Sequence, residues 1–195
     1  MGPLHGIMNP HAEFHRTQAE LEAATAWVNA APVTGGNLAG IVRRPRTNER
    51  EELNEALLDP DQGLLGDRWQ TRRNSGEPLQ PMDFATQLTL MNARAAQAVA
   101  GQRERWGLAG DQLFVDLDLS EANVPAGTRL QIGAVVVEIT APPHTGCKKF
   151  LQRFGPGALA WVNSEEGKRM HLRGVNAKII QGGTVRVGDP VVKLG

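Results

Sequence analysis

Residues 113–139, LFVDLDLSEANVPAGTRLQIGAVVVEI, carry the strongest structural signal in this chain. Leucine or valine occupies every second position over residues 113–119, which is the period of a half-buried strand. The turn sequence VPAG at residues 124–127 leads to a second predicted strand at residues 130–132, and alternating valines predict a third at residues 135–139. Strands this short and this closely spaced are typical of a β-barrel or a β-sandwich.

The strand pattern continues toward the C-terminus. Val175, Ala177 and Ile179 predict a fourth strand. The glycine pair at residues 182–183 then predicts a turn that brings residues 184–187 back as a hairpin. We therefore expect the C-terminal strands to close a barrel.

Helices are predicted mainly before this strand-rich half. Thr17 and Glu20 match the T-x-x-E capping box, and apolar residues at helical spacing follow until Pro32. Residues 43–58 predict a charged loop that leads into a short helix, and the alanine-rich residues 93–102 predict a further helix. The predicted fold class is α+β, mainly β, in which a β-barrel carries short peripheral helices.

Composition places the chain among ordinary globular proteins. Of its 195 residues, 41% are hydrophobic and 22% are charged, and the 21 basic side chains balance the 21 acidic ones. A net charge of zero predicts neither a nucleic acid nor an acidic membrane as partner. The N-terminus lacks a signal-peptide pattern, and no apolar run approaches the roughly 20 residues that span a bilayer. We therefore expect a cytoplasmic protein.

The one cysteine, Cys147, excludes an intramolecular disulfide and every zinc or iron–sulfur site that needs two thiolates from this chain. Phe150 and Phe154 follow it at helical spacing, and Gly-Pro-Gly at residues 155–157 ends this short predicted helix. In the first helical turn, the helix dipole and two neighbouring lysines would favour the thiolate form of Cys147. The same spacing equally allows Cys147 to pack as a small apolar side chain beneath the phenylalanines.

Two histidines belong to the same part of the sequence. His144 lies three residues before Cys147 and could accept its proton or contact the same ligand. His171 lies at the entry to the C-terminal strands. A metal site of Cys147, His144 and His171 is conceivable, but their spacing matches no pattern typical of metal ligands. The ordinary alternative is that each histidine only satisfies loop backbone.

Four further stretches of the sequence carry a family resemblance: LLGDRW at 64–69, DLDLSEANVPAGTRLQIG at 116–133, PHTGCKKF at 143–150 and RGVNAKIIQGGTVRVGDPVV at 173–192. Together they resemble a MOSC domain, the C-terminal domain of molybdenum cofactor sulfurases, which also occurs as small stand-alone bacterial proteins. The resemblance covers roughly residues 36–194 and implies a barrel similar to the B domain of pyruvate kinase. It divides the chain into an N-terminal arm and helix, residues 1–35, and a MOSC domain, residues 36–195.

The resemblance implies two roles for Cys147, which matches the cysteine characteristic of the family. The thiolate could carry sulfur as a persulfide toward a metal–sulfur centre, or it could ligate molybdenum in a bound molybdopterin cofactor. In either case we expect Cys147 and His144 to be the catalytic residues, and in the second case Cys147 is also the metal ligand. Basic side chains near them could meet the pterin phosphate, namely Lys148, Lys149, Arg153 and Arg173.

The resemblance also bears on cofactors and partners. Larger relatives carry a pyridoxal-phosphate desulfurase domain or an N-terminal MOSC-associated domain, and 195 residues leave room for neither. We therefore expect no pyridoxal phosphate on this chain alone, and a separate cysteine desulfurase or electron donor as partner. Activity as a molybdenum-cofactor-dependent oxidoreductase or a sulfur transferase stays open beside two alternatives. These are a non-catalytic module for cofactor delivery or partner docking, and a domain in which Cys147 serves packing only.

Overall fold

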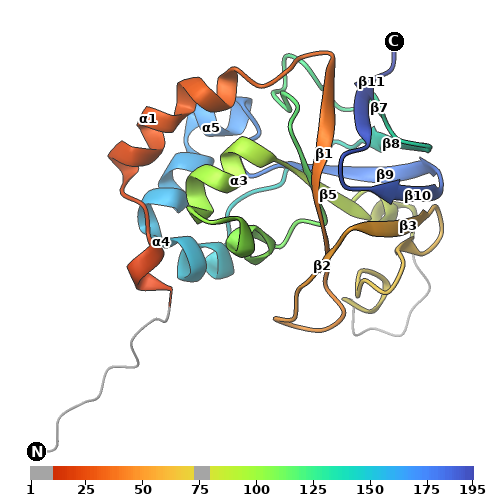
Figure 1. Ribbon diagram of the computed structural model, residues 1–195, viewed down its shortest axis with the longest axis horizontal. Helices are drawn as coiled ribbons and strands as arrows, with labels where there is room; N and C mark the ends of the chain where they lie inside the picture. Colours follow the sequence, from red (N-terminus) through yellow and green to blue (C-terminus); the bar gives the residue numbers. More distant parts are fainter. Residues whose placement is uncertain (1–10, 73–79) are drawn as a thin grey trace, which may run out of the picture.

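A β-barrel and a layer of helices stand side by side in the computed structural model, which describes residues 11–72 and 80–195 (Figure 1). The strands of the described residues are β1 (Gly35–Arg43), β2 (Glu51–Leu53), β3 (Glu55–Asp59), β4 (Gly63–Leu64), β5 (Leu88–Asn92), β6 (Leu113–Val115), β7 (Arg129–Ile132), β8 (Val135–Ile139), β9 (Val175–Gln181), β10 (Gly183–Arg186) and β11 (Pro190–Lys193). The helices are η1 (Ala12–Phe14), α1 (Gln18–Asn29), η2 (Gln70–Arg72), α2 (Pro81–Phe84), α3 (Ala93–Ala100), η3 (Arg103–Ala109), α4 (Lys148–Asn163) and α5 (Glu165–Arg169).

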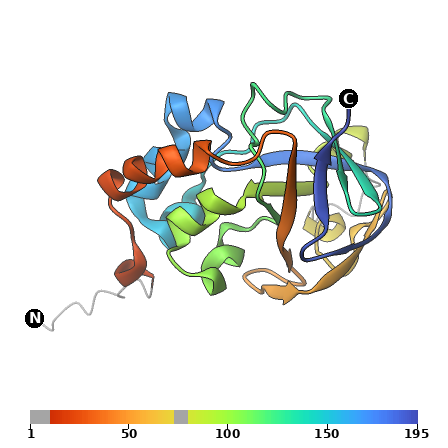
Figure 2. The ribbon, with the colours of Figure 1, turned by 45° about the horizontal axis from the view of Figure 1, so that its top comes forward.

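Seven of these strands close the barrel in the order β1-β11-β7-β8-β9-β5-β6, and β6 returns to β1. All neighbours are antiparallel except β5 and β6, which run parallel. The long strand β1 closes the ring because its first residues pair with β11, where Gly35 faces Val192, and its later residues pair with β6, where Ile41 faces Leu113. Figure 2 shows β1 and β11 running together at this closure. The predicted barrel and its closure by the C-terminal strands are confirmed.

Two predictions around the barrel are wrong. The segment before Leu58 forms strands β2 and β3 instead of a helix, and β10 pairs with β3 instead of folding back on β9 as a hairpin. In β3, Ala56 and Leu58 are buried while Glu55 and Leu57 are exposed, which is the alternation of a strand. Glutamate, leucine and alanine favour helices, so local propensity hid this pattern until pairing with β10 decided it.

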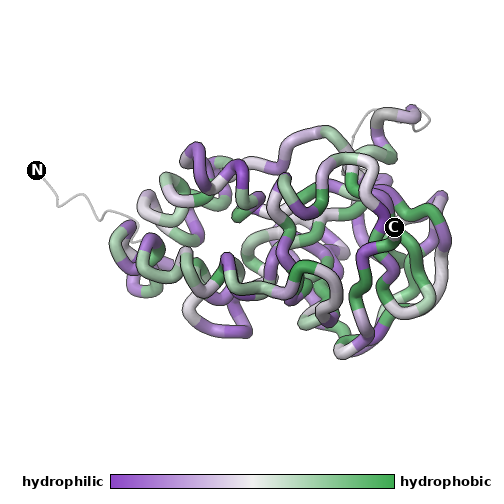
Figure 3. Tube along the Cα trace, turned by 90° about the horizontal axis from the view of Figure 1, so that it is seen from above, coloured by the Kyte–Doolittle hydropathy of each residue, from purple (hydrophilic) through white to green (hydrophobic). Residues whose placement is uncertain are grey.

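Alternate residues of the strands supply two hydrophobic cores. Leu113 and Val115 point into the barrel, whereas Phe114 between them points outward and packs against Trp106 at a ring separation of 5.4 Å. Figure 3 shows hydrophobic stretches along the barrel strands and alternation of apolar and polar residues along the helices. The barrel therefore has an internal core, and a second core joins its outer wall to the helical layer.

The helix termini follow the sequence signals. Thr17 caps α1 by accepting a hydrogen bond from the Glu20 amide, and Glu20 completes the capping box. Asn92 caps α3 by accepting from the amides of Arg94 and Ala95. In residues 11–72 and 80–195, no helix has the length and apolarity that crossing a bilayer requires.

Candidate functional site

Cys147 is the N-cap residue of α4, one position before the predicted first turn, and it is exposed. Its side chain makes no capping hydrogen bond. Gly155, at a φ of 84°, breaks α4 where the sequence predicted an end, so a short first segment follows the cysteine. Phe150 and Phe154 are buried beneath that segment, but Cys147 does not join them. The interpretation of Cys147 as a packing residue is therefore wrong.

A small cavity of about 260 Å³ lies beside Cys147, and we call it the cysteine pocket. Cys147 and His144 line it, together with the predicted Lys149, Arg153 and Arg173. Lys148, predicted with them, is not among its lining residues. Three further arginines come from the loop after β1 and from the segment before η2, namely Arg44, Arg50 and Arg68.

Four of these arginines are anchored in one way. The C-terminal end of η3 presents backbone carbonyl groups that the helix itself leaves largely unsatisfied. Each of four consecutive carbonyl oxygens accepts a hydrogen bond from a different guanidinium group. These bonds hold the four guanidinium groups side by side. The pairs are Arg50 with Gly107 at 2.8 Å, Arg153 with Leu108 at 2.8 Å, Arg173 with Ala109 at 2.7 Å and Arg44 with Gly110 at 2.7 Å.

The lining of the cysteine pocket has an excess of positive charge. Six basic side chains line it, and among the residues that the structure describes two carboxylates pair with them: Asp67 with Arg44 at 2.8 Å and Asp111 with Arg173 at 2.6 Å. Burial, and then the charges of Arg153 and Arg44, lower the pKa of Arg50 to about 10. Crowded cations of this kind are stabilised by a bound anion.

The pKa of Arg153 is affected by the same surroundings. Burial is the main cause that lowers its pKa, and the charge of Arg173 acts in the same direction. The interaction with Cys147 opposes both and raises the pKa of Arg153.

A buried charge pair holds the back wall of the cysteine pocket. One carboxylate oxygen of Asp111 accepts from Arg173, and the other lies 3.4 Å from Nδ1 of His144. Arg173 also lies over the Phe150 ring at 5.0 Å. Within the described residues, its buried Nε has no hydrogen-bond partner. Asp111 thus ties Arg173 and His144 together next to Cys147.

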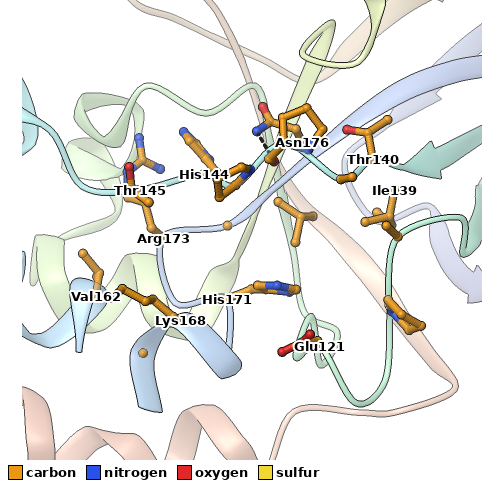
Figure 4. A pocket seen from close by; sticks show the side chains of 18 residues that line it. Glu121, Ile139, Thr140, His144, Thr145, Val162, Lys168, His171, Arg173 and Asn176 are labelled. Atoms are coloured by element: carbon orange, nitrogen blue, oxygen red, sulfur yellow. Dashed lines mark hydrogen bonds between the residues drawn. The ribbon is translucent and has the colours of Figure 1, made fainter. Parts of the chain in front are cut away.

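A second cavity of about 470 Å³ lies behind this wall, and we call it the histidine cavity. His144 and Arg173 line both cavities, whereas His171 lines only the histidine cavity (Figure 4). Its apolar sides come from the ends of β8, α4 and β9, namely Ile139, Val162 and Val175. In the described chain, no group of three or more histidine, cysteine or carboxylate side chains is placed to hold a metal ion. The conceivable site of Cys147, His144 and His171 therefore does not form.

Sequence reasoning missed Arg44, Arg50, Arg68 and Asp111. The first two belong to the run RRPRTNER at residues 43–50, which was assigned only to a charged loop. Arg68 stands in the LLGDRW stretch that supported the family resemblance. No side-chain pattern marks the carbonyls of residues 107–110, to which the cluster is anchored, so the sequence offered no signal for their role.

Comparisons with known proteins agree with this architecture. A family model described as the MOSC domain matches residues 65–192. Among solved structures, the chain is similar to YiiM from Escherichia coli, with 20% identity, 82% of this chain and 70% of that chain covered, and a TM-score of 0.52. It is also similar to YiiM from Geobacillus stearothermophilus, with 15% identity, 82% and 75% covered, and a TM-score of 0.54.

The YuaD protein from Bacillus subtilis gives a further structural match, with 11% identity, 80% of this chain and 94% of that chain covered, and a TM-score of 0.54. These likenesses show a shared fold. No curated protein matches the sequence.

Proposed function

Because the chain belongs to the MOSC domain family, which is associated with the molybdenum cofactor and with sulfur chemistry, we propose that the cysteine pocket binds molybdenum cofactor with Cys147 as the protein ligand to the metal. The observation that carries this proposal is the guanidinium cluster beside an exposed thiol. Such a pocket suits a ligand with a phosphate group and a soft metal, because guanidinium groups bind phosphate and thiolates ligate molybdenum.

The residues fit the cofactor in charge and in donor type. Each guanidinium has five N–H donors, and the bond to a carbonyl of residues 107–110 uses one of them. Arg50 and Arg153 each donate one more hydrogen bond, to the Glu49 carbonyl and to Oδ1 of Asn48, and still keep N–H donors for a phosphate group. The unsatisfied Nε of Arg173 is a further donor. A single protein thiolate suffices, since the cofactor supplies its own sulfur ligands to the metal. When bound, the cofactor would supply two-electron redox chemistry.

The residues of the chain would then have separate roles in binding the cofactor and in holding a proton. The arginines bind and orient the anionic end of the ligand, and Cys147 holds the metal. His144, with its Nδ1 facing Asp111, is placed to hold a proton beside the thiol. Electrons would come from a separate donor protein, so we assign the chain to oxidoreductases that work with a partner.

The exposure of Cys147 favours a second candidate function, sulfur carriage. The Cys147 thiolate would attack the terminal sulfur of a persulfide on a cysteine desulfurase. The S–S bond of that donor would break, the donor cysteine would leave as a thiolate, and Cys147 would become the persulfide. This candidate uses the same thiol but needs no resident metal.

The test is the molybdenum-to-protein ratio, measured by elemental mass spectrometry on protein isolated without oxygen from molybdate-fed cells. We expect near-stoichiometric molybdenum in the wild type and its loss in Cys147→Ser. Lys149→Met, inside the cysteine pocket, should lower the molybdenum content, whereas its neighbour Lys148→Met should not. A wild type without molybdenum would contradict the cofactor proposal. Intact-mass detection of one additional sulfur on Cys147 after incubation with a desulfurase and cysteine would then support sulfur carriage.

A further inference from the structure

The histidine cavity has a feature that the cofactor proposal does not use. His171 follows α5 in the chain and takes a left-handed backbone conformation, at a φ of 48°, which is uncommon for residues other than glycine. Hydrogen bonds hold the backbone there from both sides: the His171 amide donates to Lys168, and the Gly174 amide donates to His171. A conformation of this kind costs free energy, and it persists only where the surrounding structure maintains it. Such conformations are concentrated at functional sites.

The ring of His171 is fixed as well as its backbone. Nδ1 lies 2.6 Å from the carbonyl oxygen of Leu119. Because a carbonyl oxygen only accepts hydrogen bonds, we assign the proton to Nδ1, and in the neutral ring Nε2 is then an acceptor. Figure 4 shows His171 entering the histidine cavity from the side opposite His144, with Lys168 and Glu121 on either side of it.

The rest of the cavity determines which ligand suits that acceptor. Two polar side chains of the wall already donate hydrogen bonds to the protein: the Thr140 hydroxyl donates to the Ala85 carbonyl at 2.5 Å, and one N–H of Asn176 donates to the Pro142 carbonyl at 2.9 Å. The buried charge of Arg173 is already paired with Asp111. Glu121 and Lys168 also line the cavity, but both are exposed. A ligand in the buried part of this space therefore meets mainly apolar surface and a histidine acceptor, and a net charge on it would lack a buried counter-ion.

We propose that the histidine cavity binds a small, neutral, largely apolar organic molecule that donates an N–H or O–H group to Nε2 of His171. The cavity volume of about 470 Å³ lies within the range of small-molecule sites. Binding here depends on His171 and on the apolar walls and does not require a ligand in the cysteine pocket. The proposal therefore stands whether or not Cys147 holds molybdenum.

The test uses two probes that differ by one donor. Benzyl alcohol donates a hydroxyl hydrogen, and benzyl methyl ether has a similar shape but no such hydrogen. In methyl-labelled full-length protein, we expect benzyl alcohol to shift the NMR signals of Ile139, Val162 and Val175 saturably, and to shift the Nε2 nitrogen signal of His171. The ether should bind about fivefold more weakly, the factor for one hydrogen bond.

Two variants make the assignment specific. His171→Gly suits the left-handed backbone and removes the imidazole, so it should fold and should bind the two probes with equal affinity. Cys147→Ser should bind both probes as the wild type does, which separates this site from the cofactor proposal. Absence of saturable shifts at the three methyl-bearing residues, or equal affinity of the two probes in the wild type, would overturn the proposal.

Discussion

The cysteine pocket and the histidine cavity share His144 and Arg173 but are built on opposite principles. Basic side chains from segments far apart in the sequence line the cysteine pocket, and carbonyl groups of one short stretch, residues 107–110, hold four of them. The histidine cavity is lined mainly by apolar residues at the ends of barrel strands and helices, and one fixed imidazole is its distinctive polar group.

The difference shows how a protein with no net charge forms a cationic site. Composition balances 21 basic against 21 acidic residues, so the bulk charge gives no sign of such a site. Backbone carbonyls supply partial negative charge without neutralising the arginines, whereas carboxylates would cancel them. The cysteine pocket therefore keeps positive charge for a ligand, although two of its arginines form full ion pairs, Arg44 with Asp67 and Arg173 with Asp111 in the wall toward the histidine cavity.

The largest effect is expected from breaking that shared wall. Asp111→Ala leaves the buried Arg173 without its carboxylate and should lower the free energy of unfolding by about 3–5 kcal/mol. Urea denaturation measures the loss. Glu55→Ala is the matched control, because its ion pair with Arg186 is largely exposed, and it should cost less than about 1 kcal/mol. Equal losses in the two variants would show that the wall is not held by Asp111.

A smaller loss of stability is expected from a variant that alters the histidine cavity and leaves the cysteine pocket unchanged. Val175→Ala removes buried apolar groups from the wall of the histidine cavity and should cost about 2 kcal/mol in urea denaturation. Sulfate serves as a probe for the cysteine pocket because it is a tetrahedral anion like a phosphate group. Since Val175 does not line the cysteine pocket, the affinity of that pocket for sulfate, measured by calorimetry, should not change. A fall in sulfate affinity in this variant would mean that the two cavities act as one site.

The charge of the cysteine pocket gives a pH-dependent prediction. The pKa of Arg50 is lowered to about 10, so its folded-state proton is lost as the pH rises through that value while the unfolded chain keeps it. The stability cost of the buried charge therefore decreases as the pH rises from about 10 toward the ordinary pKa of arginine, and the free energy of unfolding rises with pH over that interval. Sulfate affinity should change in the opposite direction and fall, since sulfate keeps its charge there.

The measurement is a sulfate titration on either side of pH 10. Arg50→Met should weaken sulfate binding about tenfold at neutral pH and reduce its dependence on pH. Lysine side chains ordinarily titrate in the same range, so both proteins are compared in the Lys149→Met background. Persistence of the full pH dependence without Arg50 would assign it to another group.

The sequence predicted the barrel better than the site. Residues 129–132 and 135–139 form strands where alternation placed them, because a strand with one buried face carries its pattern locally. The half-buried strand predicted over residues 113–119 is confirmed only for residues 113–115, and these three residues are buried on both faces. Strand β3 was missed because its partner β10 lies far along the chain and its residue types favour a helix. Cys147 was identified as the one cysteine of the chain, and His144 because it lies three residues before it. Arg44 and Arg50 become part of the site only through carbonyl groups that the fold brings to them.

The smallest change in stability is expected at His171, because relief of backbone strain partly offsets the loss of a hydrogen bond. His171→Gly relieves a left-handed backbone that costs about 1 kcal/mol, but it loses the hydrogen bond to Leu119 and adds flexibility to the unfolded chain. The net loss in urea denaturation should be less than about 1 kcal/mol. Lys168→Gly, in the exposed helix α5 three residues earlier, relieves no strain and should cost about 1 kcal/mol. If His171→Gly lowers the free energy of unfolding by much more than Lys168→Gly, the imidazole stabilises the fold. The role of His171 would then be stability and not ligand binding.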